Sequence, residues 1–433
     1  MGRSFFKAAH PKEMYLLALT EMCQRFAFWG IGNLLVLYLV QSHNFLDKRA
    51  DNLFGIFTGV AFVLPVLGGY IADRLGYRLP VIWGCISTAI GCFFISTGVL
   101  SLLYVALVFI AIGGAVFTPS VYAILGHIYK NKQNLRDGGF TIYYSAVNIG
   151  VFLALIILGV FGEDKHWNIA FIVAGCVQLI GLIPFHKIAT SPLLADMHTR
   201  QASRNKNSNH FGKLQKKEKQ RIFVILILAF FSILFWMAYN QGGSSMTLFA
   251  LRYTNRNLFG FEMPPSWLLS AESIYLIVLA FPLAFLYQYL VKRKKDPSPP
   301  MKCALSLFAM GLCFVIMTLG SIQIPVGAIS SLLSPGYLLS AYALMALGEM
   351  LICPIGLSLI THLSPHKYTA MLVGVWYFCI GVAFYLGGLL AGYMTDFKLS
   401  EFFNLFVIAT FIPAIVLLLL VKRLDRMRHV DSL

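Results

Sequence analysis

Residues 14–40 read MYLLALTEMCQRFAFWGIGNLLVLYLV, an apolar run in which Glu21 and Arg25 are the only formally charged residues. The run is longer than the hydrophobic core of a signal peptide and shows no cleavage site, so we interpret it as a first membrane-spanning helix. A charge at the bilayer centre costs roughly 2.5–3.5 kcal/mol on insertion scales, so one that stays there usually has a partner or a water-filled cavity. Glu21 and Arg25 are four residues apart on one helix face, close enough to pair. This segment predicts a membrane protein that encloses a polar pathway.

The composition of the whole chain agrees with this interpretation. Hydrophobic residues make up 58% of the 433 residues, charged residues make up 12%, and the mean hydropathy is +0.75. These values exclude an ordinary soluble protein of two or three domains. The net charge of +16 lies mostly in segments between apolar runs, where basic residues set membrane topology and do not indicate nucleic-acid binding.

The apolar runs predict an all-α integral membrane protein of twelve spanning helices, since each run supplies the ~17–25 residues that a crossing helix needs. We expect the spans at about residues 13–41, 51–73, 79–99, 101–129, 138–161, 167–189, 221–250, 264–291, 301–323, 333–362, 368–394 and 400–422. A polar and basic stretch separates the sixth span from the seventh. The predicted domains are an N-terminal six-helix bundle, a cytoplasmic basic linker and a C-terminal six-helix bundle, at residues 1–190, 191–220 and 221–433.

The distribution of basic residues predicts the orientation. Of the 34 lysines and arginines, 27 fall on the side of the termini and of the long linker, and six fall in the opposite loops. Cytoplasmic loops carry the excess of basic residues, so both termini are expected in the cytoplasm.

Away from the ends of the expected spans, two further charged side chains lie within them, Glu272 and Glu349. No basic residue shares the span of Glu349, and burial favours the protonated form of a carboxyl group, so Glu349 is a candidate proton carrier. Glu272 is a second candidate. Its alternative is a side chain that reaches the outer surface, and the alternative for Glu349 is a structural hydrogen bond between helices. The alternative for Glu21 and Arg25 is a pair that only joins helices, which an apolar pair would do at lower cost.

The loop after the second span resembles the loop signature of the major facilitator superfamily. Residues 69–78 read GYIADRLGYR, in which glycine allows tight backbone approach, Asp73 can cap or pair at helix ends, and the arginines can anchor there. We expect a gating loop formed by Gly69, Asp73, Arg74, Gly76 and Arg78.

Further motifs narrow the resemblance to the proton-dependent oligopeptide transporters, the peptide permeases of that superfamily. In the first half, EMCQRFAFWG at 21–30 resembles the family pattern ExxERFxYYG, GGYIAD at 68–73 resembles GGxxxD, and FTIYYSAVNIG at 140–150 resembles FxxxYxxxNxG. In the second half, FWMAYNQ at 235–241 resembles FWxxxEQ, GEMLICPIGL at 348–357 resembles GExxxxPxGL, and GVW at 374–376 resembles GxW. The resemblance implies a twelve-helix major facilitator fold with alternating access between two six-helix bundles.

The chain also departs from the family pattern at several functional positions. In the first span, Gln24 replaces the family's second glutamate and Gly32 replaces an arginine. Phe62 replaces a tyrosine of the second span, Thr118 replaces the lysine of the fourth, and Asn240 replaces the glutamate of the seventh. Gln24 removes a negative charge and Thr118 removes a positive one. Because an isolated buried charge would be penalised, the two losses look coupled.

The resemblance and the intramembrane charges together predict the site residues. Proton coupling is assigned to Glu21, Arg25, Glu349 and Glu272. Substrate binding is assigned to Gln24, Phe28, Trp29, Phe62, Thr118, Tyr144, Asn148, Trp236, Asn240, Gln241 and Trp376. The neutral amides among them suit a peptide bond or another amide-like group.

These features predict a secondary active transporter that imports di- or tripeptides, or a related small organic solute, together with protons. No metal or cofactor is expected, since no metal-ligand spacing or nucleotide-phosphate loop is present and the proton gradient supplies the energy. The expected partners are the small-molecule substrate and the lipid bilayer, with no nucleic acid, and the expected state is a monomer in a cell membrane, the bacterial inner membrane. The alternatives are a facilitator or exchanger for an amino acid derivative, a nucleoside or a siderophore, or a membrane sensor that transports nothing. An intramembrane enzyme is disfavoured because the carboxylates show no paired spacing.

Overall fold

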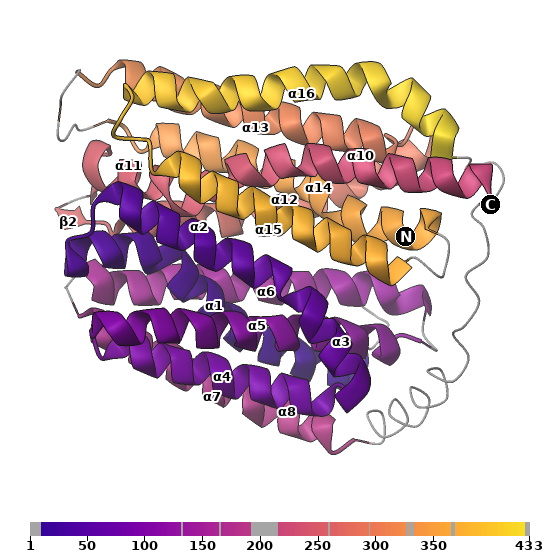
Figure 1. Ribbon diagram of the computed structural model, residues 1–433, viewed down its shortest axis with the longest axis horizontal. Coiled ribbons are helices and arrows are strands. Elements are labelled where there is room, and N and C mark those ends of the chain that lie inside the picture. The colour runs from indigo at the N-terminus through magenta and orange to yellow at the C-terminus, as the bar shows by residue number, and fades with distance from the viewer. Residues whose placement is uncertain are drawn as a thin grey trace. The chain divides into compact units, whose positions relative to one another are not determined.

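The protein is almost entirely helical (Figure 1). The computed structural model describes residues 10–130, 133–163, 166–191, 215–258, 260–293, 295–325, 328, 333–364 and 369–428. Within these residues, twelve helices are long and apolar enough to cross a membrane. The predicted count of spans is therefore confirmed. Most of the predicted linker lies outside the described residues, and α10 begins at Lys216.

The chain divides into two compact units, one within Met1–Tyr38 and Val60–His210 and the other within Leu39–Gly59 and Phe211–Leu433. The helices up to the linker are α1 (Lys12–His43), α2 (Asp47–Val63), α3 (Pro65–Leu75), α4 (Arg78–Ser96), α5 (Leu100–Ile128), α6 (Gln133–Glu163), α7 (Trp167–Ile180) and α8 (Leu182–Ala189). The elements after it are α10 (Lys216–Tyr239), η1 (Asn240–Gly243), α11 (Ser245–Tyr253), β1 (Asn257–Leu258), β2 (Phe261–Glu262), α12 (Pro265–Lys292), α13 (Pro299–Ile322), α14 (Gly336–Leu363), α15 (Thr369–Ala391) and α16 (Leu399–Arg428).

Three of the expected continuous spans are broken in the structure. The second is divided at Leu64 into α2 and α3, because Pro65 has no backbone N–H to donate and takes the first position of a new helix. The sixth is divided at Gly181, and the seventh contains the 3₁₀ turn η1 between α10 and α11. Hydropathy measures apolar length only, so it does not locate such breaks.

In the first unit, α4 packs against α5 and α7, and α3 packs against α5. Glycine allows the closest of these contacts. A Cβ atom added to Gly68 of α3 would lie 2.0 Å from the backbone oxygen of Ala115 in α5. The two helix backbones can therefore meet only because residue 68 has no side chain.

Replacing Gly68 by alanine is therefore expected to destabilise the first unit. The backbone of α5 cannot move aside easily, so we expect a loss of about 1–3 kcal/mol and a lower melting temperature in detergent. Gly126 of α5 is the matched control, because an added Cβ would meet nothing within 4 Å there. Gly126→Ala should be neutral or slightly stabilising, since alanine is the better helix former by about 1 kcal/mol. Equal melting temperatures for the two variants would contradict this packing.

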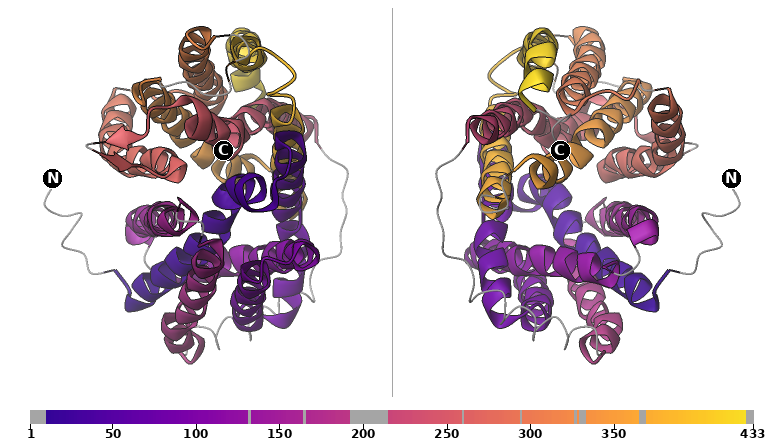
Figure 2. Two further views of the ribbon diagram at one scale, coloured as in Figure 1. Left: turned by 90° about the vertical axis from the view of Figure 1, so that its left-hand side faces the viewer. Right: turned by 90° about the vertical axis from the view of Figure 1, so that its right-hand side faces the viewer.

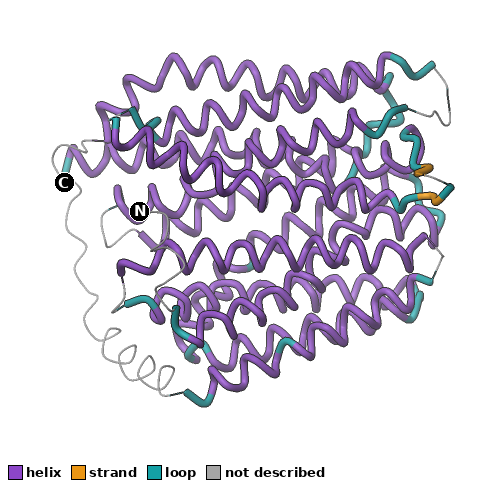
Figure 3. The backbone as a smooth tube through the Cα atoms, turned by 180° about the vertical axis from the view of Figure 1, so that it is seen from behind, coloured by secondary structure: helices purple, strands orange, loops and turns teal. Residues whose placement is uncertain are grey.

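In the second unit, α13 packs against α14 and α16, α10 against α15 and α16, and α12 against α14. The end-on views of Figure 2 look nearly along the axes of these helices. A small antiparallel hairpin, β1 with β2, lies at one end of them (Figure 3). Its turn contains Gly260 at φ +86°, a conformation that glycine adopts without strain. The all-α prediction holds for the spans but did not include this hairpin.

The segment at residues 39–59 packs with the second unit, although it precedes the linker by more than a hundred residues. Gly55 and Gly59 of α2, four residues apart, pack against the backbone of α15. A Cβ on Gly388 would lie 2.3 Å from Cα of Gly55, and one on Gly59 would lie 2.9 Å from the backbone oxygen of Gly381. This small-residue face lets the two backbones touch. The division into bundles at 1–190 and 221–433 stays a prediction, and these contacts add that part of the second span packs with the later helices.

Candidate functional site

The predicted intramembrane ion pair forms in α1. Arg25 donates from Nε to Oε1 of Glu21 at 2.6 Å, and the side chains are 13% and 0% exposed. Oε2 of Glu21 has no hydrogen-bond partner among the described atoms. Arg25 is therefore the cation that pairs with this buried carboxylate.

Two tyrosines lie close to this pair, although the sequence did not assign them to it. Tyr122 of α5 and Tyr143 of α6 lie near enough to Arg25 to interact with its charge, and their rings meet edge to face at 5.6 Å. Gln24, the neighbour of Arg25 in the chain, is 1% exposed, and its Oε1 has no partner among the described atoms. A neutral amide with an unpaired oxygen among the described atoms thus occupies the position where the family pattern has a second carboxylate.

The aromatic residues predicted in the first unit are mainly engaged with one another. Phe28 meets Trp29 edge to face at 5.4 Å, and Trp29 lies 6.0 Å from the ring of Phe62. Phe28 also fills the space beside Gly114 of α5, where a Cβ would lie 2.8 Å from its ring. Phe28 is buried, and Trp29 and Phe62 are half-buried.

The remaining predicted residues of the first unit lie on α5 and α6. Thr118 is half-buried in α5, directly before Pro119. Asn148 is 6% exposed and donates from Nδ2 to the backbone oxygen of Tyr144 at 3.0 Å. Tyr144 itself is half-buried, so it retains an accessible part.

In the second unit, Trp236 lies at the centre of an aromatic cluster. Its ring meets Tyr239 edge to face at 5.1 Å and stacks on Phe384 of α15 at 6.1 Å. Trp236 is 8% exposed, and its indole Nε1 has no hydrogen-bond partner among the described atoms. Trp376, also on α15, is 5% exposed. The Trp236 indole is thus a donor that remains for another group.

The two predicted amides that follow α10 differ in which of their hydrogen-bonding atoms remain unpaired among the described atoms. Gln241 donates to the backbone oxygens of Gly387 at 2.9 Å and Met237 at 3.3 Å, and accepts from Ser245 at 2.7 Å. Asn240 donates to the backbone oxygen of Phe384 at 3.0 Å, while its Oδ1 has no partner among the described atoms. Gln241 therefore joins η1 to α15, and Asn240 retains an acceptor.

The two carboxyl groups predicted for the later spans are brought together. Glu272 of α12 and Glu349 of α14 are each 8% exposed and lie close enough for their charges to interact. The Tyr239 hydroxyl donates a hydrogen bond to Glu272, and the Cys353 thiol lies 3.9 Å from Oε1 of Glu349. Glu272 therefore faces the interior of its unit, and the alternative of a surface-reaching side chain does not hold. The roles of both residues in proton coupling stay predictions.

The predicted gating loop forms a tight connection between α3 and α4. Gly76 adopts φ +78°, which allows the chain to turn there. Asp73 accepts a hydrogen bond from the Tyr77 hydroxyl at 2.9 Å, and the Arg74 guanidinium lies 4.4 Å from the centre of the Tyr70 ring. Asp73, Arg74 and Arg78 are exposed, and Gly69 is half-buried. The geometry shows a charged turn, and its role in gating stays a prediction.

The second unit contains a further cluster of charges that was not predicted from the sequence. The two terminal guanidinium nitrogens of Arg252 in α11, Nη1 and Nη2, donate to the carboxylate of Asp47 at the start of α2. Asp51, one helical turn further along α2, is completely buried. Hydropathy placed Asp47 and Arg252 in loops, because it ends a span at the first charges. The signal available was the pair of aspartates at i and i+4 where a helix begins.

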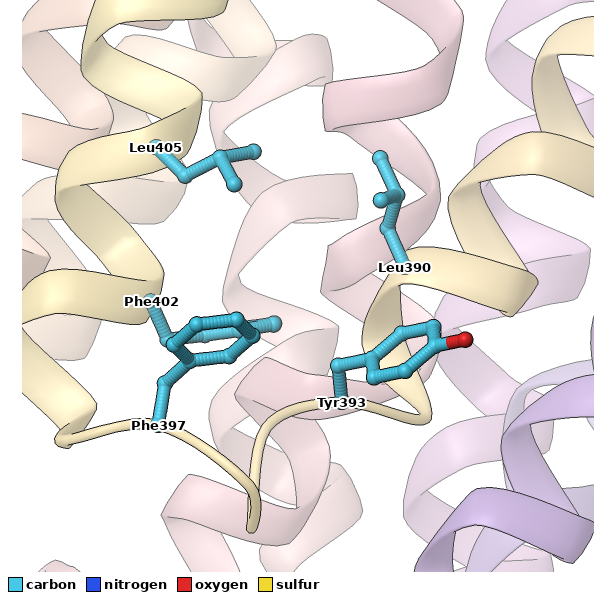
Figure 4. Close-up of a pocket in the computed structure, with 5 residues that line it drawn as sticks. All are labelled: Leu390, Tyr393, Phe397, Phe402 and Leu405. Atoms are coloured by element: carbon cyan, nitrogen blue, oxygen red, sulfur yellow. The ribbon is translucent and has the colours of Figure 1, made fainter.

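The structure also contains an apolar pocket of about 240 Å³ in the second unit, lined by Leu390, Tyr393, Phe397, Phe402 and Leu405. Figure 4 shows hydrocarbon groups facing it and the Tyr393 hydroxyl pointing away. None of the predicted binding residues lines this pocket. It offers no group that could bind the polar ends of a peptide, so it is not part of the candidate site.

Comparison with protein families decides the broad class of this molecule. Residues 17–334 match the model of the Major Facilitator Superfamily. The chain belongs to the major facilitator superfamily. This match places it among membrane transporters and not among enzymes, and twelve apolar helices make it a multi-pass protein of the cell membrane.

Similarity to individual proteins extends along almost the whole chain. It is 27% identical to the peptide transporter YePEPT of Yersinia enterocolitica, over 99% of this chain and 97% of that protein. It is 26% identical to dipeptide and tripeptide permease B of Photorhabdus asymbiotica, over 97% and 96% of the two chains. A crystal structure of a peptide transporter POT in complex with sulfate matches with a TM-score of 0.84 at 23% identity, over 96% of each chain. The resemblance to the oligopeptide transporters and the predicted fold class are thereby confirmed, whereas the orientation of the termini stays a prediction.

Proposed function

We propose that this protein is a proton-coupled secondary transporter that imports di- and tripeptides, or a closely related small solute, by alternating access. The observation that supports this most strongly is the similarity over nearly the full length to proteins named as peptide transporters and permeases. The proposal includes cytoplasmic termini, because 27 of the 34 lysines and arginines lie on their side. It also includes a monomeric working unit.

We assign recognition of the substrate mainly to neutral polar groups. In the second unit, Nε1 of Trp236 can donate and Oδ1 of Asn240 can accept, and both are buried without partners among the described atoms. Such groups match the carbonyl and N–H of a peptide bond, and a substrate that satisfies them removes the penalty of leaving them unpaired. The replacements at Gly32 and Asn240 remove charged groups that the family pattern has, so the proposed site relies less on the charged ends of a peptide.

We assign proton transfer to buried carboxyl groups. Glu349 is the first candidate because it is buried beside a second carboxyl group, Glu272. Two neighbouring negative charges repel strongly where water is excluded, so protonation of one of them is favoured. Glu21 can take up a proton when its ion pair with Arg25 opens. The energy then comes from the proton gradient, and no cofactor is required.

The proposal is tested with purified protein in liposomes that hold a pH gradient, acidic outside. We expect accumulation of a labelled dipeptide above its external concentration, which collapses when a protonophore removes the gradient. Unlabelled tripeptides should compete, and nucleosides should not. Dipeptide exchange without gradient-driven accumulation would identify a facilitator or exchanger instead. Binding without any flux would identify a sensor.

A further inference from the structure

Asp51 is a completely buried acidic residue outside the proposed peptide site. It lies in the first half of α2, is 0% exposed, and neither carboxyl oxygen has a hydrogen-bond partner among the described atoms. The other carboxylate of that helix end, Asp47, accepts hydrogen bonds from both terminal guanidinium nitrogens of Arg252. Asp51 therefore has burial without the partners that stabilise an ionised carboxylate.

The groups that face Asp51 come from three elements. Asp47 precedes it by one turn on α2, and Arg252 approaches from α11. Tyr253 of the same helix lies near Arg252 and Asp47. From α15 it meets backbone: a Cβ added to Gly388 would lie 2.7 Å from the backbone oxygen of Asp51. Among the residues that the structure describes, the site thus holds two carboxyl groups and one guanidinium, and Asp47 already binds the guanidinium.

An ionised Asp51 would add an uncompensated negative charge to this closed site. Separation of residues 39–59 from α11 and α15 would let water reach the carboxyl group and would make ionisation inexpensive. We propose that Asp51 is a proton-binding site, and that the first half of α2 packs against α11 and α15 only while Asp51 holds a proton. Because the packed and separated states differ in proton affinity, acid favours packing, and packing in turn favours proton uptake.

For transport, this inference rests on the proposed function. In a symporter, the end of the protein at which the substrate enters would close only after Asp51 has taken up a proton. Each transport cycle would therefore carry that proton together with the substrate. This proton would be additional to the one assigned to Glu349.

The first test needs no substrate. Spin labels are placed at Leu46 and Phe397, which are 80% and 53% exposed at this end of the second unit, in a variant without native cysteines. Their distance distribution is measured by electron paramagnetic resonance as a function of pH. The packed population should rise as pH falls, with the ratio of packed to separated states changing at most about tenfold per pH unit, the limit for one proton.

Asp51→Asn imitates the protonated carboxyl group, so this variant should remain packed at every pH. Glu401→Gln is the control, because Glu401 is a 58% exposed carboxylate of the same unit that pairs with Lys398 at the surface. It should titrate like the parent protein. A packed population in the parent that ignores pH would overturn the proposal, and so would an Asp51→Asn protein that titrates like the parent or cannot fold.

The second test measures the proton-to-peptide ratio in liposomes. Asp51→Asn should retain exchange of labelled for unlabelled peptide, with a ratio lower by one proton. An unchanged ratio would contradict the coupling role. If the parent protein moves no peptide, the proposed function fails, while the spin-label titration still decides whether Asp51 binds a proton.

Discussion

Replacing Arg25 by alanine is expected to abolish uptake in liposomes and to lower the stability of the protein. Arg25 forms a 2.6 Å contact with Glu21, whose side chain is 0% exposed, so the substitution leaves a buried carboxylate without its cation. Removal of one partner of a buried ion pair typically costs about 3–5 kcal/mol. The measurements are initial uptake of labelled dipeptide and the melting temperature in detergent.

Two controls separate a structural role of the pair from a functional one. Lys398→Ala removes a cation that is 60% exposed and contacts Glu401 at 3.5 Å, and such surface pairs contribute only about 0–1 kcal/mol. It should leave uptake and stability unchanged. The double variant Glu21→Gln with Arg25→Ala removes both charges, so it should regain stability but not uptake. Recovery of uptake in the double variant would show that the pair only stabilises α1.

The sequence predicted the number and approximate limits of the spans because crossing a bilayer requires a minimum apolar length. It did not predict the breaks near Leu64 and Gly181, since hydropathy does not change where a helix bends. It also did not predict that residues 39–59 pack with helices beyond the linker. That contact depends on glycines of α2 and α15 far apart in the chain, and a single sequence does not show which small residues face one another.

For the candidate site, the i and i+4 spacing was enough to predict the Glu21–Arg25 contact, because the geometry of one helix fixes it. The proximity of Glu272 and Glu349 arises between helices, so the sequence supplied both residues without their relation. Gln241 shows the limit of motif reasoning. Its amide is engaged by Gly387, Met237 and Ser245, which indicates a structural part in joining η1 to α15.

Glu349→Gln is expected to separate substrate exchange from proton coupling. Glutamine imitates the protonated carboxyl group permanently and keeps its shape, so the variant should still bind peptide and exchange labelled for unlabelled peptide. It cannot release a proton, so one proton per cycle is lost from the coupling. Since one proton contributes at most about tenfold per pH unit of gradient, accumulation should fall by up to that factor. The measurement is the ratio of internal to external peptide at a fixed pH difference.

The neighbouring carboxyl group provides the comparison that interprets this result. Glu272 is 8% exposed, accepts a hydrogen bond from Tyr239 and interacts with Glu349. If Glu349 carries the proton and Glu272 only modifies its surroundings, Glu272→Gln should shift the pH dependence of uptake but leave the proton-to-peptide ratio unchanged. A Glu349→Gln protein that accumulates peptide as well as the parent would remove Glu349 from the coupling mechanism. If the proton-to-peptide ratio falls only in Glu272→Gln, proton coupling would instead be assigned to Glu272 of α12. That carboxyl group would then take up and release its proton beside the Tyr239 hydroxyl, which is hydrogen-bonded to it.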